Sequence, residues 1–344
     1  MLVIGEYKLS NPFLMDFHEL VGKADKIRQE KWGKKAFFIK NIHLNYTNIC
    51  INHCKFCAFA KNKGQDGSYF MTVDEAINYI SKKGKDACEI HVVGGLHPDF
   101  GLDYACDMVF ALKNEFPDKA IKGFTAVEID YFASYSGLSI GAVLEKLKES
   151  GLDMMPGGGA EILDKDVRNK ICPEKISADR WLDIHRTAHK VGITSNATML
   201  YGHLESNEDK FNHLLKLRNL QEETKGFNAF IPLSFQKEGT FLSDEKFVTG
   251  IEDITTVAAS RIILENIPHI KAYWVMLGEK TAQIALRAGA DDLDGTIVKE
   301  NIANAAGGKT QSSMTVKNIV HIVKSAGLIP VERDSFYKEV KVYE

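Results

Sequence analysis

The chain has 344 residues, of which 44% are hydrophobic and 26% charged, and its formal net charge is -3. This is the composition of a globular protein, and the charge gives no electrostatic reason to expect nucleic acid or an anionic membrane as a partner. No apolar run approaches the roughly 18 residues that span a bilayer, and the N-terminus lacks the pattern of a secretory signal, so we expect a cytoplasmic protein.

The predicted elements begin with residues 12–40, which include "DFHELVGKADKIRQEKWG" and predict a helical cap. After this cap, short apolar or β-branched runs alternate with longer segments of helical spacing. Strands are predicted near residues 43–50, 87–93, 121–127, 152–156, 193–200, 228–234, 269–277 and 293–298. Helices are predicted at residues 72–83, 103–116, 139–150, 177–191, 207–223, 250–266, 279–289 and 315–326.

Eight strand-then-helix units predict an α/β fold, a (β/α)8 TIM-like barrel with an N-terminal helical cap. A doubly wound open sheet is the alternative, but it would usually show fewer units. We expect one domain over residues 1–344, with the cap at 1–40, the barrel core at 41–300, and a C-terminal helix and tail at 301–344.

Three cysteines gather in "NYTNICINHCKFCAF", residues 45–59: Cys50, Cys54 and Cys57. Cys50 ends the first predicted strand, so Cys54 and Cys57 are expected in the loop at its C-terminal end, where barrel enzymes build active sites. Thiolates are the preferred ligands of iron–sulfur clusters. Three cysteines on a 4Fe–4S cluster would leave one iron open to an exogenous ligand.

Two other interpretations of this loop remain open. His53 could complete a four-ligand zinc site, although four ligands within eight residues are tighter than the usual two separated pairs. Buried structural thiols without a metal are the second alternative. The remaining cysteines, Cys88, Cys106 and Cys172, stand alone in apolar or helical contexts and are interpreted as packed free thiols.

The pattern Cys-x3-Cys-x2-Cys, with the aromatic Phe56 before the last cysteine, resembles the signature of the radical S-adenosylmethionine (radical SAM) enzymes. The resemblance implies a barrel of the radical SAM type and a 4Fe–4S cluster held by the three cysteines. It also implies that S-adenosylmethionine binds the open iron and is split by one electron into methionine and a 5′-deoxyadenosyl radical.

The resemblance also implies contacts to S-adenosylmethionine. Gly94 and Gly95, in "HVVGGLHP", are similar to a glycine pair that meets the methionine amino group, and glycine lets backbone approach a ligand closely. Glu161, in "PGGGAEIL", is the candidate for the ribose diol, although it could instead open the following helix. Phe56 is expected to pack against the adenine, with a core aromatic as the alternative.

A narrower resemblance extends from about residue 40 to 337 and points to the aminofutalosine synthase family of menaquinone biosynthesis. Related families are dehypoxanthine futalosine cyclase and a subunit of the deazaflavin (FO) synthase. The segments that carry the resemblance are "GGLHP" (94–98), "FTAVEIDYFA" (124–133), "PGGGAEI" (156–162), "HRTAH" (185–189), "SNATMLYGH" (195–203), "HIKAYWVMLG" (269–278) and "GADDLDGT" (289–296).

This family resemblance implies a transferase that consumes S-adenosylmethionine as a co-substrate. The 5′-deoxyadenosyl radical adds to 3-[(1-carboxyvinyl)oxy]benzoate, the aryl group migrates, and a carboxylate is lost to give aminofutalosine. A pocket for this enolpyruvyl benzoate must accept an aromatic ring and two carboxylates. The candidate residues at predicted strand ends are Glu128, Asn196, Thr198, His203, Lys271, Tyr273 and Asp292.

Two of these candidates have specific expected roles. His203 could move a proton near neutral pH, and Lys271 could pair with a substrate carboxylate. Strand alternation would place Lys271 and Tyr273 on the same face. A flavodoxin or ferredoxin is a plausible electron donor. The alternatives are a cyclase-like enzyme that abstracts hydrogen, and an iron–sulfur electron-transfer or scaffold protein without a substrate.

Overall fold

The structure, a computed structural model, describes every residue except 1–2, 5–6, 9, 298–300 and 307–312. Its centre is a curled sheet of seven strands in which all neighbours are parallel. Their order across the sheet, from one edge to the other, is β10 (His269–Ile270), β9 (Phe227–Ser234), β8 (Thr194–Tyr201), β7 (Met154–Met155), β6 (Ala120–Gly123), β5 (Glu89–Val92) and β4 (Asn41–Leu44).

The eighth predicted strand, β11 (Asp292–Gly295), continues the curl beyond β10 through an isolated parallel bridge between Lys271 and Asp292. On its other side, β11 pairs with β3 (Lys35–Ile39) in a sheet completed by β12 (Ile329–Arg333) and β13 (Glu339–Val342). The backbone N–H of Asn41, at the start of β4, donates to Thr296 Oγ1 at 3.3 Å, which ties the two ends of the curl together. The predicted α/β barrel of the radical SAM type is therefore confirmed.

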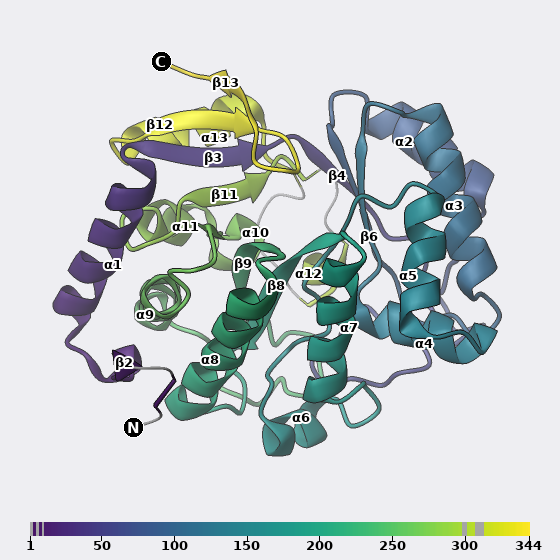
Figure 1. The fold of residues 1–344 in the computed structure, drawn as a ribbon, viewed down its shortest axis with the longest axis horizontal. Helices are drawn as coiled ribbons and strands as arrows, with labels where there is room; N and C mark the ends of the chain where they lie inside the picture. The colour runs from purple at the N-terminus through teal and green to yellow at the C-terminus, as the bar shows by residue number, and fades with distance from the viewer. Residues whose placement is uncertain (1–2, 5–6, 9, 298–300, 307–312) are drawn as a thin grey trace.

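The eight predicted helices are all present, on the outside of the sheet (Figure 1). They are α2 (Val73–Lys83), α3 (Leu102–Glu115), α5 (Ile140–Glu149), α7 (Ala178–Lys190), α8 (Asn207–Thr224), α9 (Gly250–Ile263), α11 (Glu279–Ala285) and α13 (Val316–Ser325). The further helical elements, which were not predicted, are η1 (Pro12–Leu14), α4 (Ala126–Ser136), α6 (Lys165–Ile171), α10 (Trp274–Leu277) and α12 (Ile302–Ala305). Among the helices that the structure describes, none has both the length and the apolar character of a membrane span.

The N-terminal segment is only partly helical. A short antiparallel pair, β1 (Val3–Ile4) and β2 (Tyr7–Lys8), precedes α1 (Phe17–Trp32), which packs against α9. The helix ends at Gly33, whose φ of 59° suits a residue without a side chain. Residues 35–39 then form β3, a strand that the prediction of a helical cap missed.

Several predicted strands end earlier than expected, and three of them end well before the predicted residue. The strand predicted at 43–50 ends at Leu44, so Cys50 lies within the following loop. The strand predicted at 121–127 ends at Gly123, because Thr125 and Glu128 form a capping box that starts α4. The strand predicted at 269–277 ends at Ile270 and is followed by α10, so strand alternation cannot place Lys271 and Tyr273. Residue 298, the end of the last predicted strand, lies outside the described residues.

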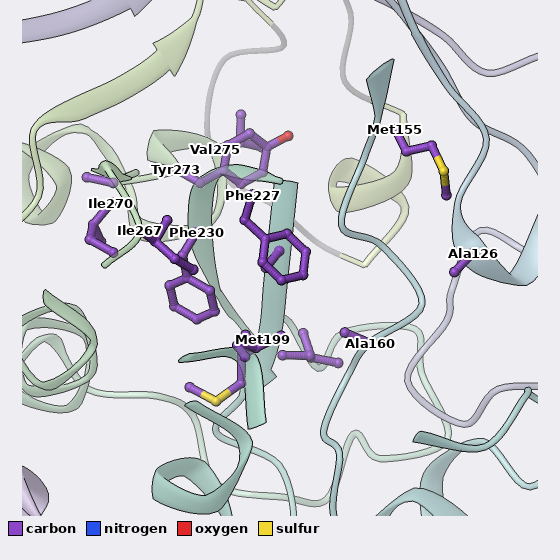
Figure 2. Packing of buried hydrophobic residues seen from close by; sticks show 14 of the residues in the cluster. Ala126, Met155, Ala160, Met199, Phe227, Phe230, Ile267, Ile270, Tyr273 and Val275 are labelled. Atoms are coloured by element: carbon purple, nitrogen blue, oxygen red, sulfur yellow. The ribbon is translucent and has the colours of Figure 1, made fainter. Parts of the chain in front are cut away.

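The apolar core lies between the sheet and its surrounding helices. Figure 2 shows part of it, where Phe230 of β9 and Ile270 of β10 lie in register and close to Ile267. All three side chains are fully buried. Burying such side chains is the main favourable term in folding, and it fixes the sheet whose strand ends carry the site.

Candidate active site

A cavity of about 330 Å³ lies where the loops after β4, β5, β6 and β7 meet. These loops leave the carboxyl ends of parallel strands, so they gather at the same end of the barrel. Side chains of β8 and β9, among them Asn196 and Ile231, complete the wall. This volume lies at the lower end of the range for small-molecule sites.

All three clustered cysteines line this cavity. Backbone hydrogen bonds hold their loop: the N–H of Cys50 donates to Lys61 at 3.1 Å, and that of Cys57 donates to Cys54 at 3.0 Å. The N–H of Lys55 donates to Ile171 at the end of α6, at 2.8 Å. Hydrogen bonds within the loop and one hydrogen bond to the end of α6 therefore fix the loop before any ligand binds.

The donor set of this loop fits a four-iron cluster better than a single zinc ion. Within the described ranges, no three His, Cys, Asp or Glu side chains converge on one metal-ion position. A 4Fe–4S cluster has no such requirement, because each cysteine binds a different iron. His53, the alternative fourth zinc ligand, is 60% exposed and instead bonds to Asn62 at 3.2 Å and pairs with Glu174 at 3.3 Å. Cys50, Cys54 and Cys57 therefore stay the predicted ligands of a cluster.

Burial disfavours charge on two of these thiols, those of Cys50 and Cys54. It raises the pKa of Cys54 to about 12, and it also raises that of Cys50. Metal ligands must be deprotonated, so binding iron has to release these protons. Cluster assembly is consequently expected to become weaker as the pH falls.

The glycine pair packs directly on the cysteine loop. The N–H of Gly95 donates to the Thr47 carbonyl at 3.0 Å. A Cβ on Gly95 would collide with the Ile49 carbonyl group and lie 2.9 Å from Cys50 Cβ, and one on Gly94 would lie 2.8 Å from the Tyr46 ring. The pair thus has a structural reason to lack side chains, and both glycines also line the cavity. Their contact with the methionine amino group stays a prediction.

Glu161 lines the cavity in an uncommon backbone conformation, with φ at 48°. Buried Arg168 stabilises the preceding loop, because its guanidinium donates to the carbonyls of Gly159 at 2.9 Å and Ala160 at 2.6 Å. Asp164 is the N-cap of α6, so Glu161 does not open that helix. A non-glycine residue held at positive φ is typical of a functional position, which favours the predicted ligand contact.

Lys175 is a site residue that the sequence analysis missed. Its ammonium lies 2.5 Å from Glu161 Oε1 and 4.9 Å from the centroid of the Phe56 ring. Burial alone would lower the pKa of Lys175, but the nearby Cys54 and Glu161 raise it above its ordinary value. A half-buried cation, whose side chain is 14% exposed, therefore connects the cysteine loop, the predicted adenine contact and the predicted ribose contact.

We expect Lys175→Met to lower the free energy of unfolding by about 3–5 kcal/mol, because it leaves the Glu161 carboxylate buried without its cation. Denaturant titration of the cluster-loaded enzyme measures this loss. The matched control is Lys63→Met, which removes an exposed pair with Asp99 and should cost at most about 1 kcal/mol. Equal losses in the two variants would contradict a structural role for the buried pair.

Glu128 belongs to α4 rather than to a strand end, and it lines the cavity. Its carboxylate accepts hydrogen bonds from Tyr46 OH at 2.8 Å, the Gly94 N–H at 3.2 Å and the Thr125 N–H at 2.7 Å. Burial raises the pKa of Glu128 to about 7. The residue can therefore exchange a proton near neutral pH at the wall of the cavity.

The remaining substrate candidates divide into two groups. Asn196, Thr198 and Tyr273 line the cavity, whereas His203 and Lys271 are not among its lining residues. His203 lies in the loop between β8 and α8, where its Nδ1 accepts a hydrogen bond from the Leu204 N–H at 2.7 Å. Lys271 is paired with Asp294 at 3.0 Å.

Asp292 is likewise outside the lining and is paired with Arg333 at 2.6 Å. Lining residues that the sequence analysis did not name include His43, His91, Lys122 and Asp294. His43, His91 and Lys122 lie within strands β4, β5 and β6. The sequence signal for each is that a polar residue interrupts an apolar run.

Comparison with known proteins adds to this geometry. Residues 44–218 match the Radical SAM superfamily, and residues 224–344 match the CofH/MqnC C-terminal region. The chain is 44% identical to an aminodeoxyfutalosine synthase of Thermus thermophilus, over 96% of this chain and 90% of the relative. It is 38% identical to an aminodeoxyfutalosine synthase of Streptomyces coelicolor, over 96% and 88% of the two chains.

A second kind of relative is nearly as similar. The 5-amino-6-(D-ribitylamino)uracil–L-tyrosine 4-hydroxyphenyl transferase of Methanocaldococcus jannaschii is 41% identical, over 93% of this chain and 92% of the relative. Among solved structures, methylornithine synthase matches with a TM-score of 0.76 and 18% identity, over 94% and 95% of the two chains, which supports the fold alone. The chain therefore belongs to the radical SAM superfamily, in the family that includes the aminodeoxyfutalosine synthases.

Proposed function

We propose that this protein is an aminofutalosine synthase that joins the adenosyl unit of S-adenosylmethionine to 3-[(1-carboxyvinyl)oxy]benzoate. The overall reaction breaks the C5′–S bond of S-adenosylmethionine and releases methionine. It forms a bond between adenosyl C5′ and the vinyl carbon, moves the aryl group from oxygen to carbon, and releases the carboxylate as carbon dioxide or bicarbonate. The observation that carries the proposal is the 44% identity to an enzyme of this name over nearly the whole chain.

The residues of the cavity have distinct roles in this proposal. When bound, the 4Fe–4S cluster and S-adenosylmethionine supply a 5′-deoxyadenosyl radical. Cys50, Cys54 and Cys57 hold the cluster. S-adenosylmethionine is positioned beside the cluster by Gly94, Gly95, Phe56 and Glu161. Lys175 fixes the Glu161 carboxylate.

The other polar lining residues face the substrate. Glu128, Asn196, Thr198 and Tyr273 bind and orient the enolpyruvyl benzoate, while the surrounding apolar wall excludes water from the reactive carbon. The three candidates that do not line the cavity support its walls. His203 stabilises the loop after β8, Lys271 pairs with Asp294, and Asp292 pairs with Arg333. The proposed electron donor is a flavodoxin or ferredoxin of the cytoplasm.

The 41% identity to the 4-hydroxyphenyl transferase supports a second candidate, transfer of a hydroxyphenyl group from tyrosine. The two functions share an aryl substrate with a carboxylate but differ in the fate of the adenosyl group. The third candidate is a hydrogen-abstracting cyclase, which would release the adenosyl group as free 5′-deoxyadenosine instead of joining it to the product.

The test is an anaerobic incubation with S-adenosylmethionine labelled with ¹³C in its ribose, a strong reductant and the enolpyruvyl benzoate. We expect the label in a product that also contains the aryl group, detected by mass analysis. Label recovered only as free 5′-deoxyadenosine would refute the proposal and favour hydrogen abstraction. A parallel incubation with tyrosine and 5-amino-6-(D-ribitylamino)uracil tests the second candidate, and Cys54→Ala is the inactive control.

A further inference from the structure

We propose that His43, His91 and Lys122 form a binding subsite for the carboxylate of an aromatic acid at the inner end of the cavity. We call this group the polar row. The inference deepens the proposed function and rests on it for the identity of the substrate. It replaces Lys271, the lysine expected from the sequence to bind a carboxylate, with a lysine that lines the cavity.

The polar row is fixed by the register of three adjacent parallel strands. His43 of β4 pairs with His91 of β5, and His91 pairs with Lys122 of β6. Residues in register on neighbouring strands lie at the same level and on the same face of a sheet. The two imidazole rings are 4.8 Å apart between centroids, and all three side chains line the cavity.

Lys122 is held in place by the carboxylate of Glu89, which lies nearer the amino ends of the strands. Its ammonium lies 2.5 Å from Glu89 Oε1, and the two side chains are 4% and 2% exposed. Glu89 is two residues before His91 on β5, so it shares the inward face but lies one level further from the strand's carboxyl end, outside the cavity lining. A lysine ammonium has three donors, so Lys122 can bond Glu89 and still donate into the cavity.

Lys271 and Arg333, two other cations of the barrel interior, are also paired with carboxylates, as Lys122 is with Glu89. Lys271 pairs with Asp294 at 3.0 Å, and Arg333 pairs with Asp292 at 2.6 Å. Asp294 also lines the cavity, but Lys271 neutralises its charge. Lys122 lines the cavity whereas Lys271 and Arg333 do not, so an entering anion can reach Lys122 but not those two cations.

His91 adds a hydrogen-bond donor without a charge. Burial, with the charge of Lys122, holds the pKa of His91 well below its usual range, so the ring is neutral and carries one N–H. Its Nε2 has no hydrogen-bond partner among the residues that the structure describes. An unmade buried hydrogen bond is costly, and in the tautomer with a proton on Nε2 a carboxylate at the inner end of the cavity supplies the missing acceptor.

The walls beside the polar row suit an aromatic ring. Val93, Ile231 and Leu233 line the same cavity, together with Tyr273. An aryl group between these side chains would be desolvated, while its carboxylate would meet Lys122 and the imidazoles. This combination selects an aromatic carboxylate over its neutral analogue, because Lys122 pairs with the anion only.

The test compares 3-methoxybenzoate with 3-methoxybenzamide, a neutral analogue of nearly the same shape. Calorimetry on the cluster-loaded enzyme, with S-adenosylmethionine and without reductant, gives a dissociation constant for each. The wild type should bind the acid at least about tenfold more tightly than the amide. Lys122→Met should reduce this ratio to near one, while Lys113→Met, which removes a pair with Asp153 away from the cavity, should leave it unchanged.

A second variant covers the case in which Lys122→Met does not fold. Glu89→Gln combined with Lys122→Met removes both charges of the buried pair and leaves no carboxylate without its cation. A wild-type ratio that persists in either folded variant, or equal binding of acid and amide by the wild type, overturns the inference. The measurement needs no turnover. Failure of the wild type to make the labelled product would therefore count against the proposed function alone.

Discussion

Cys54→Ala is expected to abolish both cluster retention and activity. The side chain is buried at the cavity wall, on a loop whose other two thiols supply the remaining ligands. The resulting two-cysteine loop cannot hold a cluster that requires three protein ligands. Cys50→Ala and Cys57→Ala should have the same effect. Iron and sulfide content, visible absorption and EPR spectra after anaerobic reconstitution measure the loss independently of turnover.

The matched control is Cys88→Ala, because Cys88 is also a partly buried thiol but lies away from this loop. Its Sγ donates a weak hydrogen bond to the Lys40 carbonyl at 3.4 Å, so its removal should leave cluster content and activity nearly intact. Similar losses from Cys88→Ala and Cys54→Ala would show that the ligand assignment is wrong.

The features that the sequence predicted well are those encoded locally. The spacing of Cys50, Cys54 and Cys57 confines them to one loop whatever the rest of the fold does. The alternation of apolar runs with helical segments likewise predicted all eight strand–helix units. The ends of these strands were harder to predict, since an apolar run such as "FTAVEI" fits a strand or a helix. In that segment the capping box of Thr125 and Glu128 was a readable signal for helix α4.

The features that the sequence did not predict depend on contacts between distant residues. Lys122 lies in the middle of an apolar strand, and its burial makes sense only beside Glu89, which is 33 residues away on another strand. Lys175 follows helix α6 in an ordinary polar turn, and only the folded chain brings it to Glu161. Long-range ion pairs of this kind leave no periodic pattern in a single sequence.

Gly95→Ala is expected to cause the second large loss, without removing any ligand or charge. Its Cβ would meet the Ile49 carbonyl group, including a distance of 2.8 Å to the carbonyl carbon, and would press on Cys50 Cβ. Backbone atoms cannot yield as a flexible side chain can, so the cysteine loop has to move. Such overpacking typically costs about 1–3 kcal/mol, and here the displaced segment carries a cluster ligand. We expect less iron per chain and at least about a tenfold loss of activity for this one methyl group.

The comparison with Gly22→Ala separates this local effect from a general sensitivity to larger residues. An added Cβ at Gly22 has nothing within 4 Å, and the residue lies inside helix α1, so alanine should raise stability by about 0.5–1 kcal/mol. Gly95→Ala protein that reconstitutes a full cluster and retains activity would mean that the loop adapts to the methyl group. That outcome would contradict the expected losses of iron and of activity.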